Sequence, residues 1–155
     1  MKSYNVGILG NCCTHGAGIC NMLNQREDTN VVAAYEGNSR RAKELQSVFG
    51  RQLSSSYQEV MNNPDLDFVA VTCDPCDKAD IVEQATTKGL HILLNKPLCD
   101  SLENAYRIMT TVKTNGVCFV YDIPMVRLIP AFAKLINQVN TGVHGKIMGY
   151  YHLFA

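Results

Sequence analysis

Short apolar segments alternate with longer amphipathic segments along most of the chain. The short segments are rich in aliphatic and β-branched residues and end in glycine or a polar residue, which is typical of buried strands. The longer segments repeat apolar residues at helical spacing. This pattern predicts strands at Val6–Leu9, Val31–Tyr35, Gln52–Ser55, Asp67–Thr72, His91–Leu94 and Val117–Tyr121.

The segments between these strands predict helices. Gly50 and Gly89 stand where helix ends favour glycine, and Ser101 stands where a helix N-cap is expected. Continuous apolar strands that alternate with helices need cover on both faces, so we expect an α/β fold with a six-stranded, doubly wound parallel sheet. One helix should begin near Thr14, and the others should span Ser39–Phe49, Tyr57–Asn62, Lys78–Lys88, Ser101–Thr114 and Pro130–Asn140.

Composition and charge exclude several classes of protein. The 14 basic and 14 acidic residues cancel without a basic stripe, so no nucleic-acid partner is expected. No apolar run approaches the roughly 20 residues that cross a bilayer, and no signal-peptide core follows Met1. We therefore expect no membrane partner and a cytoplasmic location, with the seven cysteines reduced.

The loop after the first strand is the first candidate site, because ligands of such sheets bind beyond the carboxyl ends of the strands. Gly10 permits a tight turn, and a helix that begins near Thr14 directs backbone N–H groups at a pyrophosphate. The G-x-G-x-x-G fingerprint is incomplete, because counting from Gly10 puts Cys12 and His15 at its second and third glycines. A glycine turn used only for packing stays an alternative.

Glu36 ends the second strand, where a carboxylate accepts hydrogen bonds from an adenosine ribose. Glutamate repels a 2′-phosphate at this position, which favours NAD. Arg40 and Arg41 follow, and guanidinium groups pair well with phosphate, so NADP stays possible. A solvated helix start explains both arginines equally well.

Several segments together carry a wider pattern, and the most specific is Asn95-Lys96-Pro97-Leu98 after a strand. The others are Gly7–Gly10, Glu36 with Arg41-Ala42, Asp65–Val71, Gly89–Leu94, Arg127–Pro130 and Gly142–Ile147. With these segments nearly the whole chain resembles the N-terminal, NAD(P)-binding Rossmann domain of the glucose–fructose oxidoreductase/inositol dehydrogenase/MocA (Gfo/Idh/MocA) family.

The resemblance implies an enzyme that, as a full-length protein, transfers hydride between a nicotinamide dinucleotide and a sugar, polyol or related hydroxy compound. It implies a catalytic role for Lys96, which would hold a substrate hydroxyl and help to move its proton. In the family a cis bond often precedes the proline at Pro97. Without the family, an exposed lysine at a strand end is the alternative reading of Lys96.

Two departures from the family leave a non-catalytic dinucleotide-binding or sensory module as an alternative. Asn95 replaces the usual glutamate beside Lys96, and Cys12 places a Cβ atom where the pyrophosphate lies close to glycine. The residues that we assign to the cofactor are Gly10, Asn11, Cys12, Cys13, Thr14, His15, Glu36, Arg41, Cys73, Asp74, Pro75, Asn95, Lys96 and Pro97.

The cysteines allow a third hypothesis. Cys73-Asp74-Pro75-Cys76 is a C-x-x-C at the end of the fourth predicted strand, which should neighbour the first strand. Cys12, Cys13 and His15 would then lie nearby, as ligands of zinc or as a redox partner. Cysteine is also a common small buried residue, and we assign no metal ligand.

The end of the chain departs from the alternation. Gly145–Ile147 leads into Met148–Phe154, an aromatic strand without a predicted partner. We expect residues 1–144 to form the dinucleotide-binding domain and residues 145–155 to be the first strand of a second, α+β substrate domain before which the chain is truncated. An apolar edge strand of this kind should be disordered or pair with another chain, so a homo-oligomer is possible.

Overall fold

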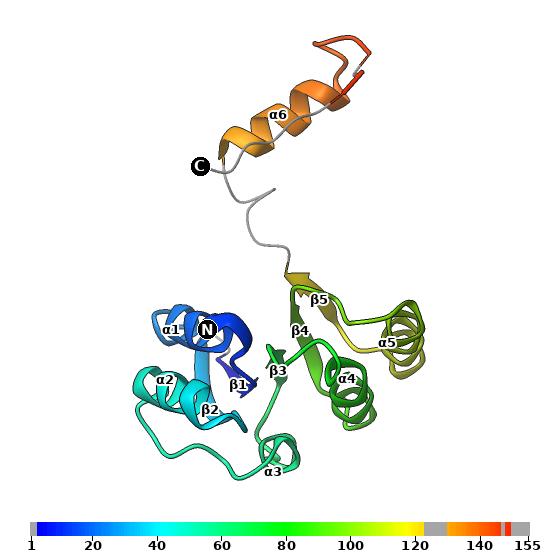
Figure 1. Ribbon diagram of the computed structural model, residues 1–155. Coiled ribbons are helices and arrows are strands. Elements are labelled where there is room, and N and C mark those ends of the chain that lie inside the picture. Colours follow the sequence, from blue (N-terminus) through cyan, green and yellow to red (C-terminus); the bar gives the residue numbers. More distant parts are fainter. Residues whose placement is uncertain (1–2, 123–129, 147, 150–155) are drawn as a thin grey trace. The chain divides into compact units, whose positions relative to one another are not determined.

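The computed structural model describes residues 3–122, 130–146 and 148–149. Contacts divide the chain into two units, Met1–Asp122 and Ile123–Ala155, which we describe separately. The first contains a parallel sheet in the order β2-β1-β3-β4-β5 (Figure 1). Its strands are β1 (Tyr4–Leu9), β2 (Thr29–Tyr35), β3 (Phe68–Val71), β4 (His91–Asn95) and β5 (Phe119–Asp122).

Helices follow the strands in the alternation that the sequence predicts. Asn38 and Ser101 cap two of them, accepting hydrogen bonds from the amides of Arg40 and Asn104 respectively. The helices of the first unit are α1 (His15–Asn24) after the short 3-10 turn η1 (Cys12–Thr14), α2 (Ser39–Phe49), α3 (Tyr57–Met61), α4 (Lys78–Thr87) and α5 (Leu102–Asn115). In the second unit, α6 (Pro130–Asn140) has the predicted bounds.

The sheet is buried on both faces, which confirms the doubly wound α/β fold. Alternate residues of one strand enter different clusters: Val69 and Val71 pack with α4 and α5, whereas Ala70 packs with α1 and α2. Val6 and Ile8 join the second cluster and are fully buried. Burial on both sides explains why these strands are continuously apolar rather than alternating with polar residues.

The predicted strand at Gln52–Ser55 is wrong, so the sheet has five described strands instead of six. The segment touches β2 through a backbone hydrogen bond from Ser54 to Ala34, and Leu53 packs on the core. Ser55 bonds to the next helix instead of extending a ladder: its amide and hydroxyl both donate to Glu59 at 2.6 Å. A polar segment without β-branched residues has little reason to extend the sheet.

The predicted strand Met148–Phe154 lies mostly outside the described residues, and its described residues, Met148 and Gly149, are not in a strand. None of the described helices is long and apolar enough to cross a membrane.

Gly16 brings α1 close to the loop after β1. A Cβ atom at Gly16 would lie 2.1 Å from the carbonyl oxygen of Gly10 and 2.8 Å from the Thr72 hydroxyl. This close packing of helix on loop is the task of the third glycine of a dinucleotide fingerprint. Counting along the sequence puts this third glycine position at His15. In the structure Gly16 makes the close contact instead, because Cys13 and Thr14 both adopt left-handed conformations (φ 51° and 64°).

Replacement of Gly16 by alanine should destabilise the first unit by about 1–3 kcal/mol, because backbone atoms must move to admit the methyl group. Gly18 lies in the same helix with open space around its Cβ position, so Gly18→Ala is the matched control and should stabilise by roughly 0.5–1 kcal/mol. Urea denaturation of both variants measures the difference. Equal midpoints would contradict the close packing of Gly16.

Candidate functional site

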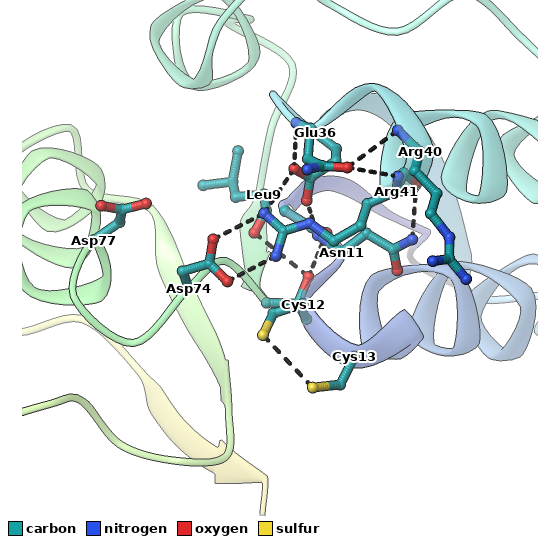
Figure 2. A network of polar contacts seen from close by, with 12 residues as sticks. Leu9, Asn11, Cys12, Cys13, Glu36, Arg40, Arg41, Asp74 and Asp77 are labelled. Carbon is teal, nitrogen blue, oxygen red and sulfur yellow. Dashed lines mark hydrogen bonds and ion pairs between the residues drawn. The ribbon is translucent and has the colours of Figure 1, made fainter.

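The carboxyl ends of β1, β2, β3 and β4 meet at one edge of the parallel sheet, and the predicted site residues lie there. Glu36 follows β2, and its side chain is only 2% exposed. Its Oε2 accepts a hydrogen bond from the Asn11 amide at 2.6 Å, and its Oε1 accepts one from the Asn38 amide at 2.7 Å. The carboxylate thus joins the loop after β1 to the loop before α2 (Figure 2).

Asn11 is fully buried and connects three elements. Besides the amide that donates to Glu36, its side-chain nitrogen donates to the carbonyl oxygen of Arg41 at 2.9 Å. Its Oδ1 accepts from the amide of Ala17 at 2.9 Å, inside the first turn of α1. Asn11 therefore caps α1 from outside the helix, while Thr14 at the N-cap position makes no side-chain cap.

Arg41, in the first turn of α2, lies between two carboxylates (Figure 2). Its Nη1 and Nη2 donate to Asp74 Oδ1 and Oδ2 at 2.7 and 2.8 Å, which is a bidentate pair. Its Nη2 also lies 3.1 Å from Glu36 Oε1. Asp74 follows β3, so this guanidinium bridges the ends of β2 and β3, and its hydrogen bonds hold the pKa of the Asp74 carboxyl below its usual value.

The adenosine half of a dinucleotide fits these residues on one condition. Glu36 stands at the end of β2, but Arg41 covers it. Arg41 Nε is buried without a hydrogen-bond partner among the described residues, so the network has an unused donor. A ribose hydroxyl that reaches Glu36 must displace Arg41 Nη2. The fit therefore requires the Arg41 side chain to turn.

The loop after β1 packs tightly on the end of β3. A Cβ atom at Gly10, where φ is 95°, would lie 2.4 Å from the Cα atom of Cys73. The Cys12 amide donates to the Thr72 carbonyl at 2.8 Å. Cys13 and Thr14 are exposed on the same turn, and His15 is half-buried at the start of α1. The structure thus brings the predicted loop residues beside Cys73 and Asp74, while Lys96 stands two strands away from β1.

Lys78 is a buried residue of this edge that sequence analysis missed. It begins α4, is 1% exposed, and donates from Nζ to the carbonyl oxygens of Asn95 and Pro97, which flank Lys96. Burial lowers the pKa of Lys78 from its usual value. A lysine at a helix start is ordinarily exposed, so only the three-dimensional position of the two carbonyl groups identifies it.

The strand end that carries Lys96 shows the cis bond that the family resemblance implies. Lys96 is exposed, and the Lys96–Pro97 peptide bond is cis. Asn95 is buried and donates from its side chain to Asp122 Oδ2 at 3.2 Å, at the end of β5. The side-chain amide of Asn95 is thus hydrogen-bonded to the end of β5, and the side chain of Lys96 is exposed to solvent.

The cysteines do not form the cluster of the metal hypothesis. Cys73 is buried, Cys76 is exposed, and all seven cysteines are free. Cys12 and Cys13 place their sulfur atoms 3.8 Å apart. No group of three or more His, Cys, Asp or Glu side chains among the described residues has an arrangement that could hold a metal ion. A shallow pocket lined by Leu102, Tyr106 and Arg107 lies on α5 and contains none of the predicted site residues.

Comparisons with known proteins identify the domain. A family model described as "Oxidoreductase family, NAD-binding Rossmann fold" (GFO_IDH_MocA) matches residues 4–123. The chain is 24% identical over 122 residues to dTDP-3,4-didehydro-2,6-dideoxy-alpha-D-glucose 3-reductase of Actinomadura kijaniata, covering 79% of this chain and 36% of that protein. It is 30% identical over 92 residues to scyllo-inositol 2-dehydrogenase (NAD(+)) of Bacillus subtilis, covering 59% and 27%.

A solved structure of KijD10, a 3-ketoreductase from Actinomadura kijaniata in complex with TDP-benzene and NADP, superposes with a TM-score of 0.76. The sequence identity is 23%, and the match covers 92% of this chain and 45% of that chain, which shows the fold alone. The chain spans about a third of the length of the curated relatives that it matches.

Replacement of Lys78 by methionine should destabilise the first unit by about 2–3 kcal/mol, because two carbonyl groups lose a charged donor. Lys88→Met removes an exposed lysine that donates to Asn62 at 2.8 Å and should cost less than about 0.5 kcal/mol. Guanidinium denaturation measures both variants. A Lys78→Met variant as stable as the Lys88→Met control would contradict the assigned role.

Stability should fall at alkaline pH because of Cys73. Burial raises the pKa of its thiol from 9.0 to about 12, so the unfolded thiol ionises at lower pH than the folded one. Its contribution is complete below pH 9 and is lost as the pH rises from 9 toward 12. The free energy of unfolding of Cys73→Ala should therefore decline less steeply in this range than that of the parent, as urea titrations at several pH values would measure.

The matched control is Cys118→Ala, which removes an exposed thiol. It should keep the slope of the parent protein. The same slope in Cys73→Ala and the parent would rule out the buried thiol as a source of alkaline instability.

Proposed function

The chain belongs to the Gfo/Idh/MocA oxidoreductase family and carries its NAD-binding Rossmann fold. From this premise we propose that the complete protein transfers hydride between a nicotinamide dinucleotide and a sugar, polyol or related hydroxy compound. The names of two relatives support this substrate class, because one is a reductase of a dTDP-sugar and the other an inositol dehydrogenase. The observation that carries the proposal is the position of Glu36 at the end of β2, bonded to the first loop.

In this proposal each loop at the carboxyl edge has one task. Glu36 accepts hydrogen bonds from the adenosine ribose, and the loop from Gly10 to His15 lies along the pyrophosphate. The loop Cys73–Pro75 flanks the cofactor. A nicotinamide dinucleotide held by these residues would supply the hydride acceptor or donor.

The Lys96 ammonium lies at the nicotinamide end, in the loop that follows β4. Its Nζ would hold a substrate hydroxyl by a hydrogen bond and help to move the proton of that hydroxyl. Position 95 supplies no carboxylate beside Lys96, because Asn95 is an amide, and its side-chain nitrogen donates to Asp122. Lys78 acts through the backbone, by bonding the carbonyl groups on both sides of Lys96.

The rest of the active site belongs to a further domain in this proposal. We assign residues 1–144 to the dinucleotide-binding domain and residues 145–155 to the first strand of the substrate domain. The chain alone would then bind the cofactor without turnover. Seven free cysteines accord with a reducing, cytoplasmic compartment.

Calorimetric titration of the chain with NADH and with NADPH tests the cofactor assignment. At least one nucleotide should bind, and Glu36→Gln should raise the Kd of NADH about tenfold or more, because a ribose hydroxyl loses a charged acceptor. Glu83→Gln, which changes a carboxylate on α4 that pairs with Arg107, is the matched control and should leave the Kd unchanged. Binding of neither nucleotide at millimolar concentration would overturn the proposal, as would equal affinities of the Glu36→Gln variant and the parent.

A further inference from the structure

Asp74 pairs with Arg41, whose guanidinium covers Glu36 in the part of the chain that the structure describes. Both carboxylate oxygens of Asp74 accept from Arg41, at 2.7 and 2.8 Å, whereas Glu36 Oε1 lies 3.1 Å from the same group. The pair with Asp74 is bidentate and shorter, so it sets where the guanidinium points. Figure 2 shows Arg41 extended from α2 toward Asp74 across the loop that contains Asn11 and Cys12.

The backbones on both sides of this ion pair are fixed. Asn38 caps α2 at Arg41, and Asn11 donates to the Arg41 carbonyl at 2.9 Å. On the other side, the Asp74 carbonyl accepts from the Asp77 amide at 3.0 Å, in the turn that leads into α4. The backbones of Asp74 and Arg41 are therefore held by hydrogen bonds, and rotation of the two side chains separates the pair without breaking those bonds.

The three side chains Glu36, Arg41 and Asp74 together carry a net charge of −1. Glu36 and Asp74 contribute one negative charge each, and Arg41 contributes one positive charge. An adenosine 2′-phosphate carries a charge of roughly −1.5 to −2 near neutral pH and needs a free cation, whereas ribose hydroxyls need only an acceptor. A guanidinium that two carboxylates already neutralise is a poor partner for the phosphate.

We propose that Asp74 is a specificity-determining residue: by pairing with Arg41 beside Glu36 it occupies and neutralises the guanidinium that a 2′-phosphate would need, and so makes the site select NAD over NADP. This inference rests on the proposed function. Asp74 lies in the loop proposed to flank the cofactor, and it affects the choice of nucleotide through Arg41. Arg40, whose side chain is 90% exposed, takes no part in this pair. Any effect of Arg40 on NADPH binding is therefore the same in the parent and in the Asp74 variants.

The test measures the Kd values of NADH and NADPH, by calorimetry, for the parent, Asp74→Asn, Arg41→Met and the double variant. Asp74→Asn keeps the side-chain shape and releases Arg41, so the ratio of the NADPH Kd to the NADH Kd should fall about tenfold, as expected for one gained charge-assisted pair. In the Arg41→Met background the same substitution should leave the ratio nearly unchanged, because the cation that it frees is absent. Asp74→Ser is a second variant with the same expectation as Asp74→Asn.

The matched control is Asp80→Asn, because Asp80 shares Arg107 with Glu83 as Asp74 shares Arg41 with Glu36. Its ratio should equal that of the parent. Binding of NADH with an unchanged ratio in both Asp74 variants would overturn this inference and leave the proposed function intact. A gain of NADPH affinity that persists without Arg41 would also overturn it, because Asp74 would then act by its own charge. Binding of neither nucleotide to any variant would overturn the proposed function and this inference together.

Discussion

The buried carboxylate of Glu36 is the constraint on which the site depends. A charge that is removed from water is costly unless hydrogen bonds and an opposite charge compensate it. Here two backbone amides and one guanidinium do so, and they come from the loop after β1, the loop before α2 and the first turn of α2. Satisfying one carboxylate therefore fixes the relative position of three segments, including the loop proposed to lie along the pyrophosphate.

A second buried charge fixes the other half of the edge. Lys78 at the start of α4 bonds the carbonyl groups on either side of Lys96. Between these two centres lies Asp74, which extends the first network to the end of β3 through Arg41. The polar groups of this edge are thus largely bonded to one another, so the proposed cofactor would gain contacts by replacing existing hydrogen bonds, first of all those of Arg41.

The alternation of apolar and amphipathic segments was enough to predict the fold, because burial on both faces of a parallel sheet leaves a strong signal. It failed at Gln52–Ser55, where an isolated backbone contact with β2 replaces a ladder. Fixed spacing located Gly10 and Glu36 but misplaced the packing glycine, since two left-handed residues shift that task to Gly16. The contacts of Lys78 and the Asp74–Arg41 pair join residues that are far apart in the sequence. No local sequence pattern predicts such contacts.

Mapping of backbone amides by NMR during titration with NADH tests the central claim most directly. The backbone amides of Asn11 and Asn38 both donate to Glu36. Ribose hydroxyls that bind the same carboxylate must therefore change the hydrogen bonds of these two amides and shift the amide resonances. The account predicts large shifts at these two amides and at Cys73, and small shifts around Leu102 and Tyr106 on α5. Shifts confined to α5, with Asn11 and Asn38 unmoved at saturation, would contradict it.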